Sequence, residues 1–200
     1  MRVLWIIRDI DGAEPLGLMY LTAMLQRAGH KVAMTGIRGE SVLACARRFA
    51  PDLIGYGCCT GQHRYYLALN RLLKRSLPPF RAVFGGPHPT FFPELIHEDG
   101  VDIVCRGEAE EAIVDLCDRL DRGAAIDDTP NFWVKHPDGT VAANACRPLL
   151  QDLDELPFPD RELRWALDPR HRDYPAQSFI TSRGCPYRCS YCFNPAMTWL

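Results

Sequence analysis

The chain has 200 residues, of which 47% are hydrophobic and 24% are charged, and its formal net charge is −2. This length is sufficient for one α/β domain with an appendage. A nearly neutral chain without a basic cluster gives no electrostatic footprint for nucleic acid or an anionic membrane, and no apolar run approaches the roughly eighteen residues of a membrane span. We therefore expect a cytoplasmic protein with no nucleic-acid or membrane partner.

The chain alternates short apolar runs with segments of helical periodicity. The predicted strands cover residues 3–7, 30–34, 53–57, 82–84 and 102–105, and the predicted helices cover residues 18–28, 41–50, 63–76 and 109–120. In the first helix Leu18, Leu21, Leu25 and Ala28 follow the spacing of one helical face. Parallel strands need crossover helices. The pattern therefore predicts a doubly wound, Rossmann-like α/β domain with a five-stranded parallel sheet over residues 1–125.

The remaining residues predict two further segments. Residues 131–142 are expected to form a small hairpin around a Pro-Asp-Gly turn, and residues 150–160, with two prolines, a stiff linker. We assign residues 126–175 to this hairpin and linker, and residues 176–200 to the start of another domain. That domain is expected to begin with a buried strand at Gln177–Thr181.

Four loops follow the carboxyl ends of the predicted parallel strands, where doubly wound sheets bind their ligands. They cover residues 8–17, 58–62, 85–90 and 106–108. Glycines in or beside them would let a large flat ligand approach the backbone: Gly57, Gly61, Gly85, Gly86 and Gly107. The run Gly55-Tyr-Gly57-Cys-Cys-Thr-Gly61 departs from a dinucleotide fingerprint in its last gap and lies on the third strand, which argues against NAD.

Three of the nine cysteines are closely spaced near the end of the chain, at Cys185, Cys189 and Cys192. Three thiolates can hold three corners of an iron–sulfur cubane and leave the fourth iron without a protein ligand. A zinc ribbon would need a second Cys-x-x-Cys pair, so a small zinc site is the weaker alternative. The odd count and absent signal peptide favour reduced thiols. Four cysteines lack metal spacing and are interpreted as structural: Cys45, Cys105, Cys117 and Cys146. Cys58 and Cys59 could be ligands, but beside Gly57 they are expected to be small buried residues at a strand end.

The segment Cys185-x-x-x-Cys189-x-x-Cys192, with Tyr191 before its third cysteine and a Thr-Ser-Arg-Gly lead-in, resembles the signature of radical S-adenosylmethionine (SAM) enzymes. The resemblance implies that the three cysteines hold a 4Fe–4S cluster, that SAM chelates its open iron, and that Tyr191 packs near the adenine. Reductive cleavage of SAM would then give a 5′-deoxyadenosyl radical.

Upstream, the motifs Glu14-Pro-Leu-Gly17, Gly85-Gly-Pro-His88-Pro-Thr90 and Arg106-Gly-Glu108-Ala-Glu110, in this order, resemble the cobalamin-binding domain of B12-dependent radical SAM proteins. The resemblance extends from Val3 to Pro195. The residues it implies as cobalamin contacts are Gly17, Thr60, Gly61, Gln62, His63, Gly85, Gly86, His88, Arg106, Gly107 and Glu108.

One familiar cobalamin motif is missing. Many cobalamin domains carry Asp-x-His-x-x-Gly, whose histidine binds cobalt, whereas the only His-x-x-Gly here is His97-Glu-Asp-Gly100 with Leu95 in place of the aspartate. Residues near the lower face of the corrinoid would then come from the loop after the third strand, with Thr60, Gln62 and His63 as candidates. His63 opens a helix, where a histidine is more often an exposed residue than a cobalt ligand, and His88 could equally contact a corrinoid amide or bond to backbone.

The resemblance implies a radical SAM enzyme that moves a methyl group from methylcobalamin to an unactivated carbon. The alternatives are a cobalamin-dependent radical cyclase or rearrangement enzyme, a non-catalytic corrinoid carrier, and a methylthiotransferase. The partners expected are a small-molecule or peptide substrate and an electron donor such as flavodoxin or ferredoxin. Because a radical SAM (β/α) barrel needs well over about a hundred further residues, we expect the chain to be the amino-terminal part of a longer protein.

Overall fold

The structure is a computed structural model, and it describes residues 1–8, 14–37 and 41–197. Residues 9–13, half of the predicted loop 8–17, and the last three residues therefore lie outside the described part of the chain. Within the described residues, no helix has the length and apolar character needed to cross a membrane.

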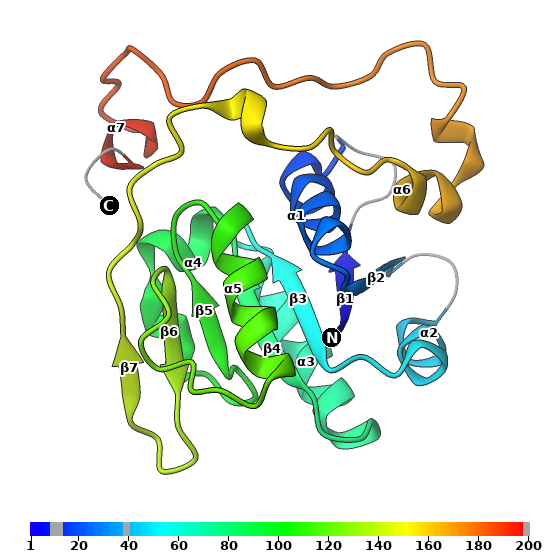
Figure 1. The fold of residues 1–200 in the computed structure, drawn as a ribbon, viewed down its shortest axis with the longest axis vertical. Coiled ribbons are helices and arrows are strands. Elements are labelled where there is room, and N and C mark those ends of the chain that lie inside the picture. Colours follow the sequence, from blue (N-terminus) through cyan, green and yellow to red (C-terminus); the bar gives the residue numbers. More distant parts are fainter. Residues whose placement is uncertain (9–13, 38–40, 198–200) are drawn as a thin grey trace.

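A single seven-stranded sheet forms the centre of the fold, in the order β2-β1-β3-β4-β5-β6-β7 (Figure 1). The parallel strands are β1 (Arg2–Ile7), β2 (Lys31–Gly36), β3 (Leu53–Gly57), β4 (Arg81–Gly85) and β5 (Ile103–Cys105). The predicted doubly wound parallel sheet is thus confirmed. Because the strand order reverses between β1 and β3, the ligand crevice of such a sheet is expected above these two strands.

The predicted hairpin forms, but it extends the sheet instead of standing apart from it. Its strands β6 (Phe132–Lys135) and β7 (Val141–Ala143) run antiparallel, and β6 pairs with β5 through Ile103 and Val134. The expected count of five strands is therefore corrected to seven. Phe132 and Val134 are buried against the core, and their strand covers an edge of β5 that would otherwise leave backbone groups unpaired.

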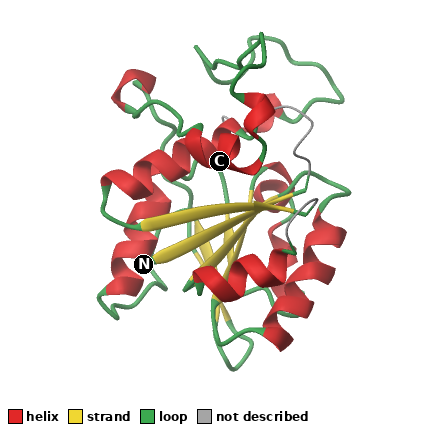
Figure 2. Ribbon diagram, turned by 90° about the vertical axis from the view of Figure 1, so that its right-hand side faces the viewer, coloured by secondary structure: helices red, strands yellow, loops and turns green. Residues whose placement is uncertain are grey.

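Helices lie on both sides of the sheet (Figure 2). The elements are α1 (Leu16–Arg27), α2 (Val42–Phe49), α3 (His63–Ser76), α4 (Pro87–Phe91), the 3-10 turn η1 (Pro93–His97) and α5 (Glu110–Asp121). The helices α1 and α5 pack on one face, and α2 and α3 on the other. The buried face of α1 includes Met19 and Thr22, whereas Ala28 is exposed beyond the helix end, so the predicted apolar face was partly wrong.

The core of the sheet includes one very close approach. Trp5 on β1 lies across Gly55 on β3, so that a Cβ placed on Gly55 would lie 2.0 Å from the ring atom Cζ3 of Trp5. The indole Nε1 of Trp5 donates a 3.1 Å hydrogen bond to Thr22 Oγ1 on α1, which fixes the ring in place. The glycine is therefore required by packing rather than by a ligand.

After β7, residues 144–197 form an extended segment, here called the arm. It runs past α1 to the short helix α6 (Glu162–Leu167) and returns to α7 (Asn194–Met197), as Figure 1 shows. It also contains the 3-10 turns η2 (Leu153–Glu155) and η3 (Pro169–His171).

The predicted buried strand at Gln177–Thr181 is not present. This stretch forms no strand, and Phe179 and Ile180 are 78% and 40% exposed. A strand is stabilised by hydrogen bonds to a neighbouring strand. Here the backbone of Ser178 is bonded to side chains instead, to Glu14 through its N–H and to Arg161 through its carbonyl. The described residues thus contain no first strand of a barrel.

Candidate functional site at the carboxyl edge of the sheet

The loops after β3 and β4 are joined directly by backbone hydrogen bonds. Cys58 N donates to Gly85 O at 2.8 Å, and His88 N donates to Cys58 O at 3.0 Å. Gly86 has a φ of +94°, and a Cβ placed there would lie 3.0 Å from Cys58 N. The backbone conformation and the close approach both favour glycine at this position. The loops after β3 and β4 therefore form one continuous backbone surface at the carboxyl edge of the sheet.

Two histidines predicted as cobalamin contacts are stacked on one another beside these loops. The rings of His63 and His88 are 3.8 Å apart between centroids and nearly parallel, and Phe92 stacks on the other side of His88 at 5.1 Å. Thr60 Oγ1 lies 3.1 Å from His88 Nδ1. Burial, and then the charge of Arg64, lower the pKa of His63, and burial followed by the neighbouring His63 lowers the pKa of His88. Both rings are thus favoured in their neutral forms.

The loop between β3 and α3 is held by its own side chains. Gln62 Oε1 accepts a 3.3 Å bond from Cys59 N, and Gly61 N donates to His63 Nδ1 at 3.2 Å. Gly61 has a φ of +93° and, like Gly17 in the first turn of α1, would have open space around an added Cβ. Thr60, Gly61 and Gly17 are exposed. These residues leave room for a ligand above the loop.

The loop after β5 is fixed by two residues that were not among the predicted cobalamin contacts, Thr90, which ends the motif Gly85–Thr90, and Asn131. Gly107, with a φ of +70°, donates from its N–H to Thr90 Oγ1 at 3.1 Å, and Arg106 Nε donates to Thr90 O at 3.2 Å. Asn131 Nδ2 donates to the carbonyls of Arg106 and Glu108 at 2.8 and 3.0 Å. Asn131 has a positive φ of 75°, a conformation that asparagine adopts more readily than most residues.

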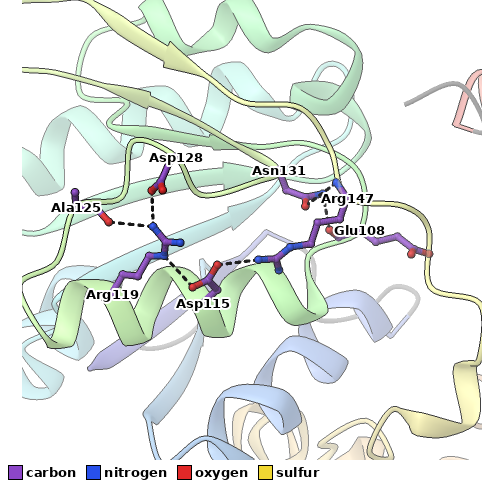
Figure 3. A network of polar contacts seen from close by, with 7 residues as sticks. All are labelled: Glu108, Asp115, Arg119, Ala125, Asp128, Asn131 and Arg147. Carbon is purple, nitrogen blue, oxygen red and sulfur yellow. Dashed lines mark hydrogen bonds and ion pairs between the residues drawn. The ribbon is translucent and has the colours of Figure 1, made fainter.

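A polar network extends from this loop along α5 (Figure 3). Arg147 N donates to Asn131 Oδ1 at 3.1 Å, and the Arg147 guanidinium donates to Asp115 at 2.8 Å. Asp115 also accepts from Arg119, which in turn pairs with Asp128. The start of the arm is in this way attached to the helix that follows the β5 loop.

The three cysteines of the predicted cluster lie on the arm. Cys185 and Cys189 are exposed, Cys192 is half-buried, and Tyr191 is 92% exposed. Over residues 1–8, 14–37 and 41–197, no group of three or more His, Cys, Asp or Glu side chains is placed to hold a metal ion. The structure thus does not bring the three thiols together. As free thiols on one surface loop they have the donor chemistry of an iron–sulfur site, and their role stays a prediction.

The other cysteines differ clearly in environment. Cys45, Cys58, Cys105 and Cys117 are buried. Burial raises the pKa of Cys58 and Cys105 and raises that of Cys117 to about 12, which keeps these thiols protonated and unsuited to binding metal. Burial also raises the pKa of the half-buried Cys146. Cys59, expected to be buried beside Cys58, is exposed because the chain turns outward after the strand end.

The edge as a whole fits a large planar ligand bearing amide groups. It combines exposed small residues, open space at Gly17 and Gly61, and neutral aromatic rings at His63 and His88. Hydroxyl and backbone groups of Thr60 and the glycine loops supply donors and acceptors beside these rings. Small-molecule and cofactor sites commonly combine apolar contacts with a few placed polar groups in this way.

A family model for the B12 binding domain matches residues 12–117, more than half of the chain. The chain belongs to the B12-binding domain family. The matched region includes the loops after β3, β4 and β5 and the helices between them. The resemblance drawn from the sequence motifs is therefore confirmed for this part of the chain.

Curated relatives include both methyltransferases and a cyclase. The chain is 31% identical over 185 residues to an uncharacterized methyltransferase of Pyrococcus horikoshii, covering 89% of this chain and 40% of the relative. It is 28% identical to the anaerobic magnesium-protoporphyrin IX monomethyl ester cyclase of Rubrivivax gelatinosus, covering 96% and 38%. It is 30% identical to the hopanoid C-3 methylase of Methylococcus capsulatus, covering 90% and 35%. The chain thus spans at most about two fifths of these relatives.

Solved structures share the fold. The cobalamin-dependent SAM radical enzyme OxsB, with aqua-cobalamin and SAM bound, matches with a TM-score of 0.74 at 22% identity, over 96% of this chain and 28% of that one. The radical SAM methyltransferase TsrM from Kitasatospora setae matches with a TM-score of 0.69 at 20% identity, over 97% and 41%. The coverage of this chain includes most of the arm as well as the sheet.

Proposed function

We propose that this chain is the cobalamin-binding part of a radical SAM enzyme that transfers a methyl group from cobalamin to a carbon atom. The observation that carries the proposal is the joining of two features: a B12-binding sheet edge, and an arm that bears the three-cysteine segment and returns to that edge. Methyltransferases among the relatives favour methyl transfer. The cyclase relative keeps a cobalamin-dependent radical cyclase as the second candidate.

In this proposal the residues have separate tasks. The loops with Gly61, Gly86 and Gly107 hold the corrinoid, Cys185, Cys189 and Cys192 hold a 4Fe–4S cluster, and Tyr191 packs near the adenine of SAM. The cluster with SAM supplies a radical that removes hydrogen from the substrate, and cobalamin supplies the methyl group. The protein contributes placement and exclusion of water, as is usual for cofactor enzymes.

The hydrogen bonding of His63 supports a corrinoid to which this ring gives no strong ligand. His63 Nδ1 accepts from Gly61 N, so the neutral ring carries its proton on Nε2 and neither nitrogen is free to bind cobalt. Thr60 Oγ1 lies 3.1 Å from His88 Nδ1, a contact that orients the His88 ring. We therefore propose that Thr60, Gln62 and His63 contact the lower face by packing and hydrogen bonding.

The test is an anaerobic ultraviolet–visible titration of the protein that carries this chain with hydroxocobalamin, followed by size exclusion and analysis of cobalt and iron. We expect about one cobalt per chain with a base-off spectrum, and iron that is lost in Cys189→Ala but kept in the matched control Cys59→Ala. A well-folded protein that retains no cobalt would contradict the proposal. With SAM labelled in its methyl group, label in the product supports methyl transfer, and an unlabelled cyclised product supports the second candidate.

A further inference from the structure

The arm is attached to the sheet edge on both sides of the cysteine segment. Two residues before Cys185, Arg183 pairs with Glu108 at 2.8 Å and also with Glu110. One residue after Cys192, the ring of Phe193 lies 5.4 Å from that of Phe91 on α4. The segment between these contacts is exposed apart from the half-buried Cys192.

The pairing of Arg183 uses both ends of its guanidinium group. Nη1 donates to Glu108 Oε1, and Nη2 donates to Glu110 Oε1. The Arg183 and Glu108 side chains are 25% and 18% exposed, and that of Glu110 is 7% exposed. Two neighbouring carboxylates in so little solvent would repel one another without a cation between them. The planar fork of arginine can bridge them, whereas a lysine ammonium cannot reach both in the same way.

The two carboxylates are themselves fixed. Glu108 Oε2 accepts from Leu150 N at 2.6 Å, and Glu110 Oε2 accepts from Ala109 N at 3.1 Å. Glu110 is the first residue of α5, where a negative charge is favoured by the helix dipole. Asn131 holds the carbonyls on either side of Gly107. Arg183 therefore binds a rigid point on the same loop, residues 106–108, that forms part of the corrinoid edge.

We propose that Arg183 is a positioning residue whose bridge to Glu108 and Glu110 sets where the cysteine segment lies relative to the corrinoid edge. This proposal rests on the proposed function only in identifying the two bound groups as an iron–sulfur cluster and a corrinoid. If the segment holds a cluster, its distance from cobalt is fixed through this bridge, and loss of the bridge changes that distance without removing any ligand of either group.

The first test needs no cofactor. In the full protein without cofactors, chymotrypsin cleavage after Phe179 and after Tyr191, two sites that do not adjoin residue 183 or 188, is followed by mass spectrometry. The matched control for Arg183→Gln is Arg188→Gln, because Arg188 lies exposed in the same segment and forms no ion pair within the described residues. We expect cleavage about tenfold faster in Arg183→Gln, since an enzyme cuts a segment that detaches from its support, and a change within about twofold in Arg188→Gln.

Two further variants keep the test decisive. Arg183→Lys retains the charge and should give an intermediate cleavage rate, and it serves if Arg183→Gln does not fold. In the double variant Arg183→Gln with Glu110→Gln, the second change should add little to the first, because both remove the same contact. Equal cleavage rates in Arg183→Gln and Arg188→Gln would overturn the proposal.

The second test uses the reconstituted protein. The reduced cluster speeds the relaxation of the cob(II)alamin electron spin, and this effect falls steeply with distance. We expect Arg183→Gln to retain wild-type cobalt and iron but to lose a large part of this relaxation effect, with Arg188→Gln unchanged. An unchanged effect in Arg183→Gln would contradict the proposal. If the wild type retains neither metal, the proposed function fails, while the cleavage test still decides the role of the bridge.

Discussion

The sheet unit, residues 1–143, and the arm, residues 144–197, are held in place by different forces. Apart from Arg164, the fully buried residues of the structure belong to the sheet unit, within the part of the chain that the structure describes. The arm is attached mainly by polar contacts, such as Asp160 N to Met19 O, Ser178 N to Glu14, and Arg183 to Glu108. Its apolar contacts with the sheet unit come from the partly buried Leu163 and Leu167 of α6 and from the half-exposed Phe193. Full apolar burial therefore stabilises the first region, whereas hydrogen bonds, ion pairs and partly buried apolar contacts hold the second.

The packing of the arm over α1 is correspondingly open. A groove of about 550 Å³ lies between Ala23, Gln26 and Arg27 of α1 and residues 158–165 of the arm. Exposed aromatic residues along the arm include Phe158, Tyr174, Phe179, Tyr187 and Tyr191. Regions with few buried apolar contacts open at low free energy, and binding or catalytic segments are commonly drawn from them. The sheet unit is therefore tightly packed, whereas the arm is packed more openly and is the region expected to adjust its position more easily.

Replacing a phenylalanine by alanine in the sheet unit and in the arm should give the largest difference in the free energy of unfolding. Phe84 on β4 is fully buried and stacks on Tyr56 at 4.5 Å, so we expect Phe84→Ala to lower the free energy of unfolding by about 3–5 kcal/mol. Phe158 in the arm is 93% exposed, and Phe158→Ala should change it by less than about 0.5 kcal/mol. Urea unfolding followed by circular dichroism measures both. Similar losses in the two variants would show that the arm is part of the core.

Two glycine-to-alanine substitutions test how tightly the centre of the sheet unit is packed compared with its surface. In Gly55→Ala the new methyl group meets the buried ring of Trp5, and we expect a loss of about 1–3 kcal/mol in the free energy of unfolding. The control is Gly17→Ala, where the added Cβ has no heavy atom within 4 Å and the residue lies in α1. Alanine favours helix over glycine, so this variant should be unchanged or stabilised by up to about 1 kcal/mol. Thermal unfolding compares the pair.

The sheet unit was predictable from the sequence, and the arm was not. The strand Leu53–Gly57 and the helix His63–Ser76 were predicted at their observed bounds. In each, the spacing of the apolar residues indicates which side chains are buried in the core of the sheet unit. The segment Gln177–Thr181 contains Phe, Ile and Thr, which favour strands, but the described chain offers it no neighbouring strand. The residue pattern indicates which side chains a segment could bury, but a strand also needs a neighbouring strand for its backbone hydrogen bonds.

The candidate site shows the same division. The glycine loops and His88 were found from their place after predicted strands, and the structure joins them. Thr90 and Asn131 were missed, because their roles depend on contacts with loops about 17 and 25 residues away in the sequence. The bridge from Arg183 to Glu108 spans 75 residues, and no local pattern could have indicated it.

Buried thiols should make the sheet unit sensitive to alkaline pH. The pKa of Cys117 is raised by burial from 9.0 to about 12. Between these values the folded state keeps a proton that the unfolded state releases, so stability falls as pH rises, by up to about 1.4 kcal/mol per pH unit. We expect Cys117→Ala to flatten the decline measured by urea unfolding at pH 8, 9 and 10. Cys59→Ala, which removes an exposed thiol, should leave the slope unchanged. Equal slopes in the wild type and Cys117→Ala would contradict the assignment.

The smallest effect on global stability is expected where the arm meets α1. Glu14 accepts from Ser178 N at 2.6 Å and from Arg161 Nε at 3.3 Å, with both charged side chains about 15% exposed. Glu14→Ala removes the acceptor of the Ser178 amide, so its hydrogen exchange, measured by nuclear magnetic resonance, should accelerate severalfold. The free energy of unfolding should change by less than about 1 kcal/mol, since the core does not include this contact. Glu94→Ala, at an exposed position on η1, should change neither quantity. A large loss in the free energy of unfolding in Glu14→Ala would mean that the arm and the sheet unfold as one unit. The distinction between a tightly packed sheet unit and a more openly packed arm would then fail.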